Sequence, residues 1–252
     1  MDLTNAANQF FFATVKIESD KPSGMESGTG FIFSQKLENE NYLFIVSSRQ
    51  LSQNASEGRI SFTKKLGDKP DIGNRFDLTI SDFERAWTAH PDPNIDLAVM
   101  PLVPILDYLF NDGVEIFFTT ISSESTLDEE RLSSREALED ILLYSYAEDW
   151  YDQDKHLPVM CSGTTATPVY LDYKGSSAFL VNAQVTPGCN GSPVFLVEKE
   201  AFQKLNGVGF RNRFYFLGLL SNNEQKNQMG TVLKAKVITD ICEIMLRNLE
   251  EN

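Results

Sequence analysis

Short runs rich in Phe, Ile, Val and Tyr recur along the chain, and clusters of Gly, Asn, Asp and Ser separate them. Such runs are typical of β-strands, because β-branched and aromatic side chains pack well on a pleated surface and the separating residues form turns. The pattern predicts a mainly β fold of antiparallel strands. We expect strands at Phe10–Ile17, Gly30–Ser34, Tyr42–Ser47, Arg59–Lys64, Phe76–Ile80, Asp96–Leu102, Val114–Thr119, Ile141–Tyr144, Thr165–Leu171, Ala178–Val185, Pro193–Glu198, Phe214–Leu220 and Gly230–Leu233.

Helical spacing of apolar residues is clearest at the C-terminal end. Between Lys236 and Glu250 the apolar residues recur every three or four positions, which predicts an amphipathic helix packed on the second half of the chain. A shorter helical turn is expected after Pro104. The acidic stretch Glu124–Asp140 has no strand pattern and is expected to form an exposed loop with a helical piece.

The acidic stretch divides the chain near its middle, which suggests two β-barrel subdomains. We expect an N-terminal barrel over residues 1–112, a C-terminal barrel over 113–235 and a helix over 236–252, all within one domain.

The composition narrows the possible environments and partners. No apolar run reaches the roughly 18 residues that a membrane span needs, and Met1–Asn5 lacks the basic start and apolar core of a secretory signal, so we expect a cytoplasmic protein. The three cysteines contain no CxxC pair, which predicts free thiols and no zinc site. The net charge of -14 opposes nucleic-acid binding and favours a peptide or protein partner, and no cofactor is indicated.

Four separated segments give the chain a recognisable order. They are GTGFIF (Gly28–Phe33), FIVSSRQL (Phe44–Leu51), NIDLAVMPL (Asn94–Leu102) and PGCNGSPVF (Pro187–Phe195). In sequence and spacing they resemble the trypsin-like serine peptidases of the chymotrypsin fold, and further matches extend the likeness over nearly the whole chain. The resemblance implies two six-stranded antiparallel β-barrels with an active-site cleft between them.

The resemblance also assigns positions to a catalytic triad. The aspartate position holds Asp96, the histidine position holds Gln50 and the serine position holds Asn190. Carboxamides neither titrate near neutral pH nor supply an alkoxide, so the usual acyl transfer is excluded and a pseudoprotease is implied. We expect the Gln50 side chain to donate a hydrogen bond to Asp96, and a further hydrogen bond between Gln50 and Asn190.

The resemblance also implies an oxyanion hole, a specificity pocket and a peptide-binding strand edge in the same cleft. The resemblance places an oxyanion hole at the backbone N–H groups of Gly188 and Asn190. It places the specificity pocket at Gln184, and a strand edge that can pair with a bound peptide at Ser221, Asn222 and Asn223.

Two alternatives remain open at this stage. The chain could be a working hydrolase that uses Cys189 as nucleophile with His90 or His156 as base, although Cys189 stands one residue before the reactive position. It could also be a structural domain whose cleft is blocked by the segment 124–140. The acidic loop around Asp152 and His156 has no recognised ligand spacing, so no metal site is predicted.

Overall fold

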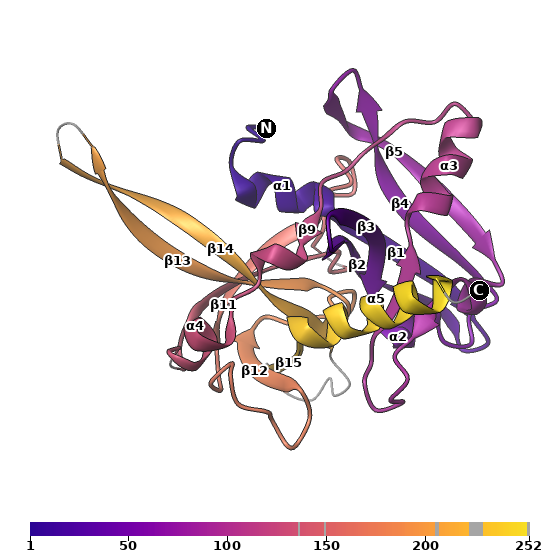
Figure 1. The fold of residues 1–252 in the computed structure, drawn as a ribbon. Helices are drawn as coiled ribbons and strands as arrows, with labels where there is room; N and C mark the ends of the chain where they lie inside the picture. Colours follow the sequence, from indigo (N-terminus) through magenta and orange to yellow (C-terminus); the bar gives the residue numbers. More distant parts are fainter. Residues whose placement is uncertain (136, 149, 205–206, 222–228, 251–252) are drawn as a thin grey trace.

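The computed structural model describes residues 1–135, 137–148, 150–204, 207–221 and 229–250, and within these ranges the chain forms two β-sheets (Figure 1). The first sheet follows the order β5-β4-β1-β2-β3-β7-β6, with β8 beside β4 and β9 beside β2. Its strands are β1 (Thr14–Lys21), β2 (Gly24–Leu37), β3 (Glu40–Ser47), β4 (Glu57–Leu66), β5 (Lys69–Ser81), β6 (Thr88–Ala89), β7 (Ala98–Pro101), β8 (Ile116–Phe117) and β9 (Ile121–Ser122).

The second sheet closes into a barrel with the order β10-β11-β12-β15-β14-β13. Its strands are β10 (Asp140–Ser145), β11 (Val159–Thr165), β12 (Ala178–Ala183), β13 (Pro193–Lys204), β14 (Gly207–Ser221) and β15 (Met229–Lys234). The α-helices are α1 (Ala6–Ala13), α2 (Arg49–Ser52), α3 (Val103–Asn111), α4 (Glu129–Ser133) and α5 (Ala235–Glu250), and 3₁₀ turns cover Phe83–Ala86 and Ser123–Ser125.

The predicted fold class is confirmed: the chain is mainly β, with two sheets and a C-terminal helix. The first sheet differs in detail, because within the described residues it has nine strands rather than six. The short strands β8 and β9 still belong to this sheet, so it continues past the division expected after residue 112. Within the same ranges, no helix is long and apolar enough to cross a membrane.

The strand expected from Phe10 is wrong over its first four residues, which form the end of α1. Asn5 caps this helix by accepting a hydrogen bond from the N–H of Ala7. Phe10 stacks on Phe195 at 3.9 Å between ring centroids and meets Tyr144 edge-on. These partners lie far away in the sequence, so tertiary packing overrides the local β preference of the phenylalanines.

The strand expected at Thr165–Leu171 is also misplaced, because β11 ends at Thr165. Pro168 lacks the N–H that a strand ladder needs, which explains why the strand stops before it. The strand instead covers the more polar residues from Val159, whose composition gave no strand signal.

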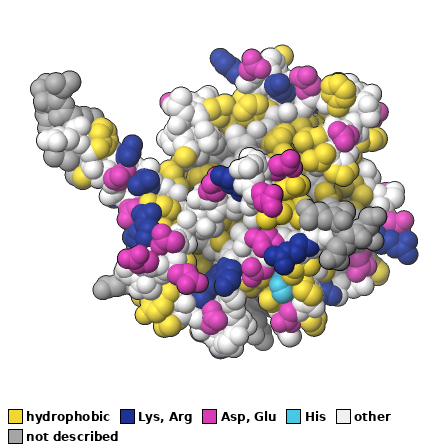
Figure 2. Space-filling view, in the orientation of Figure 1, with side chains coloured by type: hydrophobic (Ala, Val, Ile, Leu, Met, Phe, Trp, Pro, Cys, Tyr) yellow, Lys and Arg dark blue, Asp and Glu magenta, His cyan; other side chains and the backbone are white. Residues whose placement is uncertain are grey.

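Strands β13 and β14 extend beyond the barrel as a long two-stranded arm (Figure 1). Beyond Leu196 they pair with each other, and Glu200 on β13 binds Arg211 on β14 at 2.7 Å. Cross-strand ion pairs of this kind stabilise a ribbon that has no core to pack on. Figure 2 shows the arm standing out from a face on which acidic and basic side chains are mixed.

Helix α5 packs against both halves of the molecule rather than on the second barrel alone. It leaves β15 and crosses the front of the molecule toward the first sheet (Figure 1). Ile238, Ile241 and Cys242 are buried in a core that also contains Phe31 of β2 and Phe216 of β14. The helix therefore joins the two sheets through one shared core.

We predict that Ile238→Ala lowers the free energy of unfolding by about 2–5 kcal/mol, because it removes a fully buried side chain and leaves a cavity in this core. Asp240→Ala, an exposed position on the same helix, should change it by less than about 0.5 kcal/mol. Urea denaturation measures both. Equal midpoints for the two variants would contradict the packing described.

Candidate functional site

A short helix positions Gln50 at the end of β3. Ser48 is the N-cap of α2, and its hydroxyl accepts a hydrogen bond from the backbone N–H of Gln50 at 3.2 Å. This cap turns the chain away from the sheet directly after Ser47. As a result the Gln50 side chain is exposed beside the second barrel.

A glycine turn positions Asn190 on the opposite side. Gly188 and Gly191 both have φ of +88°, a conformation that favours glycine, and a Cβ on Gly191 would collide with the carbonyl of Thr29. Thr29 of β2 holds this turn from across the sheets: its N–H donates to the carbonyl of Asn190 at 2.9 Å, and its hydroxyl donates to the carbonyl of Gly188 at 2.7 Å.

Asp96 lies between these two segments, and only 9% of its surface is exposed. In the described part of the chain its carboxylate accepts three hydrogen bonds. Oδ2 accepts from the hydroxyls of Ser48 at 2.6 Å and Ser221 at 3.1 Å, and Oδ1 accepts from the backbone N–H of Gln50 at 2.8 Å. A buried carboxylate needs such donors, since an uncompensated charge costs several kcal/mol.

The structure thus brings Gln50, Asp96 and Asn190 into one hydrogen-bond network. The bond between Gln50 and Asp96 is present, but its donor is the main-chain N–H and not the expected side-chain nitrogen. The Asn190 side chain donates to Ser48 Oγ at 2.8 Å and to Gln50 Oε1 at 3.4 Å.

Ser48 is the residue that the sequence reasoning missed. Its hydroxyl, rather than the Gln50 amide, lies between Asp96 and Asn190. In a working triad an imidazole N–H donates to the aspartate. Here Ser48 and Ser221 take both lone pairs of Oδ2. A signal was available, because a serine two residues before Gln50 is a typical helix cap.

The structure places Gln184 and Ser221 differently from the predicted specificity pocket and strand edge. Gln184 is exposed after the end of β12 and does not line the hollow beside Asn190, where Val185 and Thr186 stand instead. Ser221 is buried and bonded to Asp96, so its side chain belongs to the network and not to an open strand edge. Asn222 and Asn223 lie outside the described residues. The oxyanion role of the Gly188 and Asn190 N–H groups stays a prediction.

A groove runs between the two sheets from Asn190 outward. A hollow of about 360 Å³ is lined by Gln50, Gly188 and Asn190, and it adjoins a second hollow of about 260 Å³ lined by Lys16, Glu18, Tyr151 and Gln153. The two share four lining residues, Met25, Glu26, Ser27 and Glu148. We call this continuous space the intersheet groove.

The residues of the rival hydrolase do not meet. Cys189 is 1% exposed and lies in the core of the second barrel, with its Sγ 3.6 Å from Thr186 Oγ1. His90 accepts a hydrogen bond from the N–H of Asp92. His156 contacts Arg75, and burial together with this positive neighbour lowers the pKa of His156.

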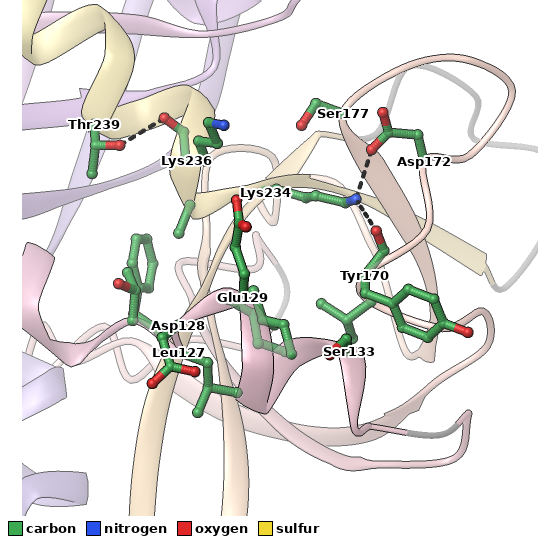
Figure 3. Close-up of a pocket in the computed structure, with 16 residues that line it drawn as sticks. Leu127, Asp128, Glu129, Ser133, Tyr170, Asp172, Ser177, Lys234, Lys236 and Thr239 are labelled. Atoms are coloured by element: carbon green, nitrogen blue, oxygen red, sulfur yellow. Dashed lines mark hydrogen bonds and ion pairs between the residues drawn. The ribbon is translucent and has the colours of Figure 1, made fainter.

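A larger cavity of about 610 Å³ lies elsewhere, on the second barrel beside the start of α5 (Figure 3). Lys234 crosses it and binds Asp172 at 2.6 Å and the carbonyl of Tyr170 at 3.1 Å. Leu127 and Glu129 from the acidic stretch line the opposite wall. Among the described residues, no group of three or more His, Cys, Asp or Glu side chains is arranged to hold a metal ion.

Comparison with solved structures assigns the fold to a class. A serine endoprotease from Yersinia pestis matches with a TM-score of 0.53 and 12% identity, over 98% of this chain and 67% of that one. A catalytically active tobacco etch virus protease complexed with product matches with a TM-score of 0.51 and 13% identity, over 93% and 78%. No protein-family model and no curated protein matches the sequence. The chain therefore has the fold of the chymotrypsin-like proteases.

We predict that an imidazole placed by Gln50→His keeps an ordinary pKa, because Ser48 already occupies the carboxylate oxygen that the ring would need. In the double variant Ser48→Ala with Gln50→His, the ring can reach Asp96 and its pKa should rise by about one unit or more. Two-dimensional NMR of the ring protons against pH measures both. A raised pKa in the single variant would show that Ser48 does not block the contact.

Proposed function

We propose that this protein is a catalytically inactive homologue of the trypsin-like serine proteases, and that it binds a peptide or protein segment in the intersheet groove. The observation that supports this most directly is the network at the centre of the groove. Gln50 and Asn190 supply carboxamides where a base and a nucleophile would stand, and the Ser48 hydroxyl fills the space beside Asp96.

This arrangement keeps the acidic residue of the triad and lacks its base and its nucleophile. A carboxamide cannot accept the proton of a nucleophile near neutral pH, and it cannot attack a carbonyl as an oxyanion. Removing a serine or histidine from a working triad costs about 10⁶ in turnover, and the two losses overlap because the triad acts as a unit.

A retained binding role explains why the rest of the groove is so well supported. The Thr29 hydrogen bonds tie the turn around Asn190 to the first sheet, and the Asp96 network ties α2 to the end of β14. A groove with fixed walls loses little entropy when an extended peptide enters it.

The two alternatives fit the structure less well. A hydrolase based on Cys189 would need a buried thiol to reach the groove. A blocked cleft would need the segment 124–140 to cover the groove, but that segment lines the cavity of Figure 3 and none of its described residues lines the groove.

The proposal includes a cytoplasmic location and a partner that is not a nucleic acid. Cys161, Cys189 and Cys242 are free thiols, which suits a reducing compartment. The net charge of -14 suits a peptide or protein partner better than a phosphate backbone.

We predict that the purified protein does not hydrolyse casein or fluorogenic peptides faster than the Asn190→Ala variant does. It should also resist a fluorophosphonate probe, because position 190 carries a carboxamide and not a hydroxyl. Mass spectrometry after mild iodoacetamide treatment should show less label on Cys189 than on the half-buried Cys161. Hydrolysis that disappears in the Asn190→Ala or a Cys189→Ala variant would overturn the proposal.

We further predict that Met25→Trp weakens peptide binding at least about tenfold, because a bulky ring on this exposed residue narrows the groove where its two hollows meet. Leu66→Trp, at an exposed position that lines neither hollow, serves as the control. Fluorescence polarisation with peptides selected from a random library measures both affinities. Equal affinities for the two variants would place the binding surface elsewhere.

A further inference from the structure

We propose that the loop between β10 and β11 is a pH-sensitive wall of the intersheet groove, which neutral His156 holds against the first sheet and which is released when His156 takes up a proton. We call residues 150–158 the His156 loop. The release itself does not depend on the proposed binding function, and only its effect on a bound peptide rests on that function.

The His156 loop belongs to the second barrel but packs on the first sheet. The Tyr151 hydroxyl accepts a hydrogen bond from Lys16 of β1 at 3.3 Å, and Lys16 also lies over the tyrosine ring. The backbone carbonyl of Asp154 lies so close to Gly73 of β5 that a Cβ on this glycine would be 3.4 Å from it. Tyr151 and Gln153 line the groove, so the position of the loop decides the width of the groove at this end.

One hydrogen bond between the loop and the first sheet depends on the protonation of a histidine. Nη1 of Arg75 on β5 lies 2.9 Å from Nδ1 of His156. A guanidinium only donates hydrogen bonds, so Nδ1 accepts this one and the imidazole is neutral. A proton on Nδ1 would remove the acceptor and would place two positive groups at hydrogen-bond distance.

The acids near His156 are engaged elsewhere or offset its neighbour only in part. Asp77 accepts from Nε of Arg75 at 3.0 Å, and Asp152 is paired with Lys155 at 2.9 Å. Burial and the charge of Arg75 lower the pKa of His156 by more than the nearby acids raise it. The titratable and charged groups around this side chain are Arg75 and Asp77 of β5, Lys16 of β1, Tyr146 and Tyr151, and Asp152, Asp154 and Lys155 of the loop itself.

The second barrel fixes the backbone of His156 independently of its ring. The residue has φ of +53°, a left-handed conformation that is uncommon outside glycine. Its carbonyl accepts a hydrogen bond from the Tyr146 hydroxyl at 3.1 Å, and the N–H of Asp152 donates to the carbonyl of Leu157 at 3.2 Å. Loss of the ring contact therefore frees the loop from the first sheet without unfolding it.

The direction of the pH dependence follows from the two states of the loop. In the released loop the ring is in water and has its ordinary pKa of about 6.5, whereas the docked ring has a lower pKa. The released loop therefore binds the proton more readily. Docking is complete above about pH 6.5 and weakens as the pH falls below this value, by at most about thirtyfold at about pH 5.

The test measures amide hydrogen exchange of the His156 loop by mass spectrometry at about pH 7.5 and about pH 5, with rates corrected for the intrinsic effect of pH. Protection of the loop should fall by about five- to thirtyfold at the lower pH. Strand β12 of the same barrel should stay protected over the same labelling time. Unchanged protection of the loop would overturn the inference, and so would exchange of β12 together with the loop.

His156→Asn is the deciding variant. Oδ1 of an asparagine can accept from Arg75 near the position of Nδ1, tolerates the left-handed backbone and does not titrate. Protection of its loop should fall by less than about twofold. His90→Asn removes the only other histidine of the sequence and should respond as the unmodified protein does. A full loss of protection in His156→Asn, or an absent loss in His90→Asn, would overturn the inference.

Peptide binding tests the effect on the groove separately. Library peptides that bind at about pH 7.5 and contain no His, Asp or Glu should bind about fivefold more weakly at about pH 5, and less than about twofold more weakly to His156→Asn. Equal affinity at both values of pH, with the loop released, would overturn the control of the groove. Failure of every peptide to bind would overturn the proposed function, while the exchange experiment would still decide the release of the loop.

Discussion

The carboxylate of Asp96 is the interaction on which the centre of this molecule depends. It is buried, and its hydrogen-bond donors come from both sheets: Ser48 and the Gln50 backbone from the first, Ser221 from the second. A buried charge is tolerated only while such donors remain, so the carboxylate obliges the two halves to keep their relative position. In a working protease an imidazole would share this duty. Here the Ser48 hydroxyl donates to the carboxylate.

The shape of the turn around Asn190 does not depend on the side chain at its centre. Its geometry is set by Gly188 and Gly191 and by the hydrogen bonds from Thr29 to main-chain carbonyls. None of these contacts uses the side chain at position 190. The backbone conformation therefore does not depend on the side chain at position 190, whereas a side chain on Gly191 would collide with the first sheet.

The sequence allowed the fold class and the helix α5 to be predicted, because both follow from the repeating pattern of apolar residues and turns. It did not reveal that Phe10 belongs to a helix, since the deciding contact is with Phe195 at the other end of the chain. It placed Gln50, Asp96 and Asn190 in one site, where the structure finds them hydrogen-bonded. The sequence allows Ser48 to be predicted as a helix cap, but its second role, as a hydrogen-bond donor to Asp96, follows only from the placement of the loop in space.

Hydrogen bonds between buried groups hold the walls of the intersheet groove in place. In this protein the support is dense: the Asp96 donors and the Thr29 contacts hold the groove walls. Near them, the buried hydroxyl oxygen of Ser27 has no hydrogen-bond partner within the described residues. A buried polar atom without a partner costs stability in the protein as it stands. Walls that are held in place by buried hydrogen bonds are what the proposed binding function requires.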